Sequence, residues 1–243
     1  MNTLNSDIET LRERGYIEGY DMGKFNELDK TGLIKLLHDE FPVHRSAAAK
    51  IIRAKCNVDE VEMANILLEQ LYKEKKLYTR LEICTTLESG NIITAKEMIP
   101  YIGKIGNNQH KTLPERPSLK SSYPLPRDLI VRSLARMKRD IMPVLMDALR
   151  SGETDKIREI LDAIGFLTFY DRKAASVEYI NKIIDTIEKF KNDKIITWKG
   201  IICLSSFPFV QSTKYLKEIC ENSKNELFVQ EAKRAINLMF KNK

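Results

Sequence analysis

The chain of 243 residues is 43% apolar and 30% charged, and it contains 10 glycines. This length and apolar content suffice to bury a core, which excludes a disordered chain, and the few glycines disfavour an all-β fold with many tight turns. The N-terminal residues lack the apolar stretch of a secretory signal. The longest uncharged run, residues 200–213, is shorter than the roughly 20 apolar residues that span a bilayer. We therefore expect a cytoplasmic protein that does not act in a membrane.

From residue 31 onward, apolar residues recur at the helical spacing i, i+3, i+4 and i+7, and no segment alternates with a period of two. The pattern predicts an all-α fold. Residues 1–30 are expected to form an N-terminal cap or a docked helix. The rest of the chain predicts about six helical hairpins, made of residues 32–40 with 43–55, 61–71 with 77–87, 94–105 with 127–137, 140–149 with 157–167, 177–187 with 195–205, and 215–219 with 228–239.

The second helices of these hairpins share a further pattern. Residues 42–52, PVHRSAAAKII, combine a turn, a Val and an Arg, three small residues and a final aliphatic pair. Related segments occur around Arg80, Arg132 and Arg158. This pattern resembles the HEAT-repeat family. The resemblance implies a right-handed α-α superhelix (a solenoid) of about six HEAT-like hairpins, a single repeat domain over residues 1–243 that offers a concave face to a partner. Trp198-Lys199 and Val229-Gln230 depart from the pattern in the last two units.

Residues 106–126 interrupt the third hairpin. This stretch has no helical periodicity and contains four of the eight prolines. A loop of this length inside a compact domain is typically either functional or disordered, so two interpretations stay open: a mobile, solvated insert, or part of a binding surface.

The positive charge of the chain is concentrated at this insertion. Residues 106–139 carry eight Lys and Arg residues and two acidic ones, so this segment alone accounts for the formal net charge of +6. We expect its cations to form a basic lip that recruits an acidic partner. The candidate binding residues are Lys111, Arg116, Lys120, Arg127, Arg136, Lys138 and Arg139. Arg127, Arg132 and Arg136 are expected near one side of a helix over residues 127–137.

No motif for catalysis, metal binding or a cofactor is recognisable. The sequence has no GxSxG or phosphate-binding glycine loop, and His38 and His44, six residues apart across a turn, lack the spacing of a zinc-binding pair. The widely spaced Cys56, Cys84, Cys203 and Cys220 are expected to be reduced core residues. We therefore expect no metal and no cofactor.

Two functions remain. The first is a non-catalytic scaffold that binds another protein with an acidic surface through its concave face or the basic lip. The alternative is a nucleic-acid-binding or DNA-repair protein, because bacterial DNA glycosylases that remove alkylated bases share the HEAT-like fold and use Trp, Asp and basic residues. Trp198, Asp193 and Lys199 are the corresponding candidates here. Burial of the Trp198 indole in the core would remove its base-stacking role.

Overall fold

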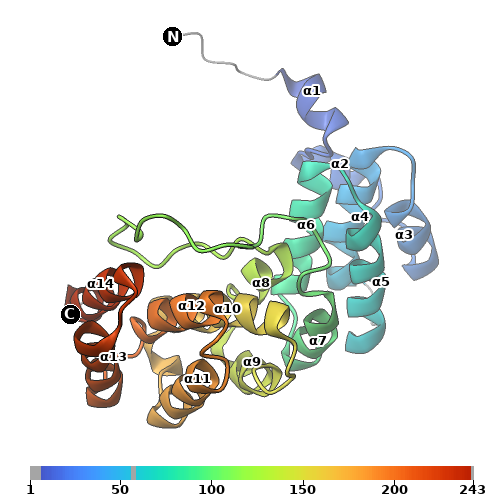
Figure 1. Ribbon diagram of the computed structural model, residues 1–243. Helices are drawn as coiled ribbons and strands as arrows, with labels where there is room; N and C mark the ends of the chain where they lie inside the picture. Colours follow the sequence, from blue (N-terminus) through green and yellow to red (C-terminus); the bar gives the residue numbers. More distant parts are fainter. Residues whose placement is uncertain (1–6, 56–58, 242–243) are drawn as a thin grey trace. The chain divides into compact units, whose positions relative to one another are not determined.

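The computed structural model describes residues 7–55 and 59–241, and these residues contain helices and no strand (Figure 1). The all-α prediction is therefore confirmed for this part of the chain. The chain divides into two compact units, Met1–Tyr101 and Ile102–Lys243, which we describe separately. The single repeat domain over residues 1–243 stays a prediction.

Unit 1 contains seven α-helices and a short 3₁₀ turn among its described residues. They are α1 (Ile8–Glu13), α2 (Gly19–Gly23), α3 (Lys30–Leu37), α4 (Pro42–Lys55), α5 (Glu60–Lys73), α6 (Leu77–Glu88), α7 (Ile92–Met98) and η1 (Ile99–Tyr101). Aspartate side chains cap three of these helices, because Asp7 accepts the backbone N–H of Thr10, Asp29 that of Gly32 and Asp59 that of Val61. Residues 7–30 form the two short helices α1 and α2 and the start of α3, and both α1 and α2 pack on α4.

Alternate helices of unit 1 lie side by side. Helix α4 packs against α6, and α5 packs against α7. The predicted small residues Ala47, Ala48 and Ala49 are fully buried. Their size lets α6 approach so closely that the Thr86 hydroxyl donates to the Ala49 carbonyl at 2.8 Å.

Unit 2 contains seven α-helices and two 3₁₀ turns, preceded by a long segment without helix. The elements are α8 (Leu129–Leu134), η2 (Arg139–Ile141), α9 (Met142–Ala148), α10 (Thr154–Tyr170), η3 (Arg172–Ala174), α11 (Val177–Lys189), α12 (Lys194–Leu204), α13 (Val210–Asn222) and α14 (Glu226–Lys241). Helices α8, α10, α12 and α14 are neighbours in that order, and α11 packs on α13.

The helix expected over residues 127–137 is wrong in its length, because α8 spans only Leu129–Leu134. It begins late because the carboxylate of Asp128 caps it, accepting the Val131 N–H at 3.0 Å. Arg127 therefore precedes the helix and Arg136 follows it, so the two do not share a helix face.

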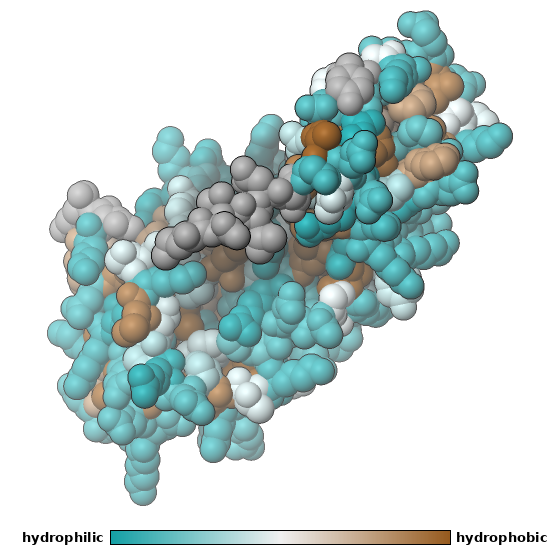
Figure 2. All heavy atoms as spheres, turned by 90° about the horizontal axis from the view of Figure 1, so that it is seen from above, coloured by the Kyte–Doolittle hydropathy of each residue, from teal (hydrophilic) through white to brown (hydrophobic). Residues whose placement is uncertain are grey.

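Most of the surface visible in Figure 2 is hydrophilic, and hydrophobic side chains appear there only in small groups. Of the cysteines, Cys84 and Cys203 are buried and Cys220 is half-buried. Cys203 and Cys220 have free thiols, and Cys56 lies outside the described residues. Within the described ranges, no helix combines the length and the apolarity that crossing a bilayer requires.

Candidate functional site

Residues 106–126, which we call the strap, are docked on unit 2 (Figure 1). Tyr123 is 2% exposed, and its hydroxyl donates to the Leu161 carbonyl of α10 at 3.5 Å. Its ring occupies a notch at Gly165, where a Cβ atom would lie 1.9 Å from the tyrosine oxygen. The interpretation of the strap as a mobile, solvated insert is therefore wrong, because a buried aromatic side chain anchors it.

Hydrogen bonds also hold the start and the middle of the strap. At its start, the buried carboxylate of Asp128 accepts from the backbone N–H of Gly103 at 3.0 Å and from the Gln109 amide at 2.7 Å. In its middle, the Ser118 N–H donates to the fully buried Glu231 of α14 at 2.7 Å, and Arg234 donates to the Lys120 carbonyl at 3.2 Å. The strap therefore has a defined path over α10 and α14.

A cavity of about 250 Å³ lies under the strap, and three predicted lip residues surround it. Arg116 and Lys120 come from the strap, and Arg127 comes from its C-terminal junction with α8. Its other lining residues are His110, Pro114, Ser118, Pro124, Leu125, Asp162, Trp198 and Ile202. The fold thus brings together cations that are up to eleven positions apart in the chain.

The other four lip residues do not line this cavity, all of them being among the residues that the structure describes. Lys111 lines a neighbouring cavity of about 280 Å³ with Glu159 and Arg158. Arg136, Lys138 and Arg139 are exposed after α8, where Arg139 pairs with Asp171 at 3.0 Å. The predicted lip is therefore divided into a group of three at the cavity and four residues elsewhere.

A charged cluster that sequence reasoning did not find is buried beside the cavity. The Lys199 ammonium lies 2.5 Å from a carboxylate oxygen of Glu159 and 2.8 Å from one of Asp162, and the lysine is 1% exposed. Burial raises the pKa of Glu159 to about 7, and it raises the pKa of Asp162 although Lys199 opposes this. Burial opposes the charge of Lys199, but the two carboxylates raise its pKa above the ordinary value. The lysine is therefore protonated, and its ammonium group forms ion pairs with both carboxyl groups.

Trp198 precedes this lysine in α12 and lines the cavity. It is 6% exposed, belongs to an apolar cluster with Tyr123 and Phe169, and meets the His110 ring edge-on at a centroid distance of 4.8 Å. Burial, Arg127 and Lys199 together lower the pKa of His110 to about 4, so this ring is neutral at pH 7. Because the indole is packed in this way, its face is not free for a base to stack on.

Asp193, the acidic residue that the sequence places near Trp198, has a structural role. Its carboxylate caps α12 by accepting the N–H groups of Ile195 and Ile196, and it pairs with Arg158 of α10 at 2.6 Å. The acidic residue that shares the cavity with Trp198 is instead Asp162. It lies one helical turn after Glu159 on α10.

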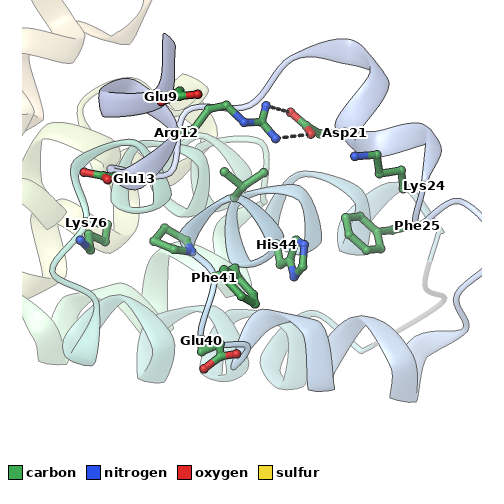
Figure 3. Close-up of a pocket in the computed structure, with 12 residues that line it drawn as sticks. Glu9, Arg12, Glu13, Asp21, Lys24, Phe25, Glu40, Phe41, His44 and Lys76 are labelled. Carbon is green, nitrogen blue, oxygen red and sulfur yellow. Dashed lines mark hydrogen bonds and ion pairs between the residues drawn. The ribbon is translucent and has the colours of Figure 1, made fainter. Parts of the chain in front are cut away.

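Unit 1 has a second cavity, of about 520 Å³, between α1, α2 and the start of α4 (Figure 3). Phe25 and Phe41 flank His44 at centroid distances of 5.1 and 5.2 Å, and both contacts are edge-on. At its edge, two hydrogen bonds of 2.7 and 2.8 Å join Arg12 to Asp21 and lower the pKa of that carboxyl. The remaining charged side chains around it have both signs (Figure 3).

The histidines considered as metal ligands have other partners. His38 lies 2.9 Å from the Gln70 amide oxygen, and His44 lies 3.1 Å from Asp39. Over residues 7–55 and 59–241, no group of three His, Cys, Asp or Glu side chains is placed to hold a metal ion.

No protein-family model, curated protein or solved structure matches this chain.

Proposed function

We propose that this chain is a non-catalytic scaffold of HEAT-like hairpins, stacked as a right-handed α-α superhelix, that binds an acidic partner protein through the basic lip. The neighbouring order of α8, α10, α12 and α14 in unit 2 supports the repeat architecture. The free, buried thiol of Cys203 favours a reducing compartment, and we propose that the protein acts in the cytoplasm.

One observation carries this proposal: the docked strap holds Arg116, Lys120 and Arg127 around one cavity. Cations on a disordered loop would lose conformational entropy on binding, whereas those on an anchored segment lose less. A surface with three cations close together also attracts an acidic partner during diffusion and accelerates association.

Charge reversal tests the lip. We expect the triple variant Arg116→Glu, Lys120→Glu, Arg127→Glu to bind a fluorescent poly-glutamate peptide about tenfold more weakly, since each exposed ion pair contributes about 0.2–1 kcal/mol. The control carries the same charge change at exposed lysines away from the cavity, as Lys191→Glu, Lys214→Glu, Lys217→Glu. Equal binding by both variants would show that only net charge matters and would refute the lip.

Nucleic acid is the second candidate, favoured by the net charge of +6 concentrated in residues 106–139. Titration with duplex and single-stranded DNA at about 50 mM salt separates the two, because phosphate contacts are strongest at low salt. If DNA binds more tightly than poly-glutamate and its affinity falls steeply with salt, the partner is nucleic acid and not an acidic protein. Absence of DNA binding at this salt would eliminate the alternative. The packing of Trp198 under the strap weighs against base stacking in a DNA-repair role.

A further inference from the structure

The cavity under the strap contains a buried hydrogen-bond donor without a partner. The indole N–H of Trp198 makes no hydrogen bond to any residue that the structure describes, although the side chain is 6% exposed. A buried N–H group without an acceptor destabilises a fold by about 1–3 kcal/mol. Asp162, which also lines the cavity, is 15% exposed and shares its ammonium partner with Glu159. The residues that line the cavity thus include a hydrogen-bond donor, Trp198, and an acceptor, Asp162, which match the C=O and N–H of a peptide backbone.

The charges around the cavity match a doubly charged anion. Arg116, Lys120 and Arg127 supply three positive charges. The cluster of Lys199, Glu159 and Asp162 carries at most one net negative charge, because burial raises the pKa of Glu159 to about 7. At least two positive charges therefore remain. A phosphomonoester carries about −1.5 to −2 at pH 7, whereas a carboxylate carries only one charge. Two of the three cations are arginines, whose planar guanidinium groups match phosphate oxygens in pairs.

The size of the cavity limits how much of a partner can enter. A cavity of about 150 Å³ accommodates benzene, so the 250 Å³ here suits one short side chain and the adjoining backbone. We propose that the cavity binds a single phosphoserine or phosphothreonine of the acidic partner, with its phosphate between Arg116, Lys120 and Arg127 and its backbone amide at Trp198 and Asp162. This inference rests on the proposed function and names the chemistry of its partner.

Small probes test the phosphate-binding and the backbone-binding parts of the site by titration calorimetry. The probes are phosphoserine with both its termini blocked as amides, the equivalent blocked glutamate, inorganic phosphate, and cytidine monophosphate. We expect blocked phosphoserine to bind at least about fivefold more tightly than inorganic phosphate, because one added hydrogen bond contributes about 1 kcal/mol. We also expect it to bind more tightly than blocked glutamate, which carries one charge.

Two variants assign the contacts. Trp198→Phe removes the N–H and keeps an aromatic ring, so we expect it to abolish the preference for blocked phosphoserine over inorganic phosphate without weakening phosphate itself. Arg127→Gln, at an exposed position, should weaken both by about tenfold, since it removes a charge-assisted hydrogen bond. Lys191→Gln, also exposed but outside both the cavity and the basic lip, is the control and should change neither. If Trp198→Phe does not fold, the Arg127→Gln variant and the comparison of blocked glutamate with blocked phosphoserine still test the proposed phosphate site.

Several results would overturn the inference: blocked glutamate binding as tightly as blocked phosphoserine, cytidine monophosphate binding more tightly than either, or a folded Trp198→Phe that retains the full preference. Poly-glutamate distinguishes this failure from failure of the proposed function. If the wild-type protein binds poly-glutamate and none of the small probes, the proposal of a phosphorylated residue is refuted, and the proposal that the basic lip binds an acidic protein is retained. If it binds neither, the proposed function fails as well.

Discussion

Replacing Lys199 with methionine removes the ammonium group that Glu159 and Asp162 share inside unit 2. The lysine is 1% exposed, and the carboxyl side chains are 2% and 15% exposed. Methionine fills a similar volume, so the main change is electrostatic. Two carboxyl groups then remain in a poorly hydrated position, and each must either stay charged without its partner or take up a proton from solvent.

The free energy of protonation sets the magnitude of the effect. At pH 7.5, protonating a carboxyl group of ordinary pKa near 4.3 requires about 4 kcal/mol, at 1.36 kcal/mol per pH unit, and at pH 5 it requires about 1 kcal/mol. Breaking a buried ion pair by removing one partner destabilises proteins by about 3–5 kcal/mol, in agreement with the first value. We therefore expect Lys199→Met to lower the free energy of unfolding of unit 2 by about 4 kcal/mol at pH 7.5 and by roughly 1–2 kcal/mol at pH 5.

The assay is urea unfolding followed by the fluorescence of Trp198. This is the only tryptophan of the sequence and adjoins residue 199, so its signal reports unit 2. Lys191→Met, at an exposed position of the same unit, is the control and should change stability by less than about 0.5 kcal/mol. A loss below about 1 kcal/mol at pH 7.5, or a loss that is the same at both pH values, would refute the description of this cluster as ionised and buried.

Two further predictions concern the strap and unit 1. Gly165→Ala should expel Tyr123 from its notch and increase cleavage within residues 106–126 in limited proteolysis, whereas Gly19→Ala, where a Cβ meets no atom within 4 Å, should not. In unit 1, burial acts to raise the pKa of Glu74, but hydrogen bonds from the Arg45 side chain and from the backbone N–H of Lys76 hold that pKa below its ordinary value. The stability from this carboxylate is full above about pH 4.5 and is lost as the pH falls through the lowered pKa, so Arg45→Met should be destabilising near pH 7 by about 3 kcal/mol and less so in acid, measured by thermal unfolding. Equal losses at both pH values would contradict this.

The helices themselves could be predicted from the sequence because each apolar stripe is a local property. The predicted pair over 140–149 and 157–167 corresponds to α9 and α10, and Ile157, Ile160, Leu161 and Ile164 are all fully buried as the periodicity indicates. A helix with one buried face repeats its apolar residues in register with its own turns, so no information from elsewhere in the chain is needed.

The end of a helix depends on partners that the local sequence does not contain. The sequence pattern places Asp128 inside a longer helix. Its carboxylate instead accepts hydrogen bonds from Gly103 and Gln109, far earlier in the chain, as well as from Val131. Those contacts fix Asp128 outside α8 and place Arg127 at the cavity instead of on the helix. The spacing of residues within 127–137 cannot predict these contacts with Gly103 and Gln109.

The buried charges show a similar division between what is local and what is not. Helix α12, KIITWKGIICL, is apolar on all sides, so a lysine in its middle indicates a buried ammonium that needs a carboxylate. The sequence near Trp198 offers Asp193, which caps the same helix. The actual partners lie on α10, where Glu159 and Asp162 are one turn apart. Only the packing of α10 against α12 identifies them.

The position of the strap likewise depends on contacts with distant parts of the chain. Its prolines and lack of periodicity correctly indicate the absence of helix, but they carry no information on docking. Docking depends on one glycine of α10 that leaves space for Tyr123 and on Glu231 and Arg234 of α14 that bind its backbone. The same three residues determine where Arg116 and Lys120 lie, since both of these cations flank Ser118. The position of the basic lip is therefore a consequence of the packing of unit 2, and a change such as Gly165→Ala, which touches none of its cations, should weaken anion binding as well as loosen the strap.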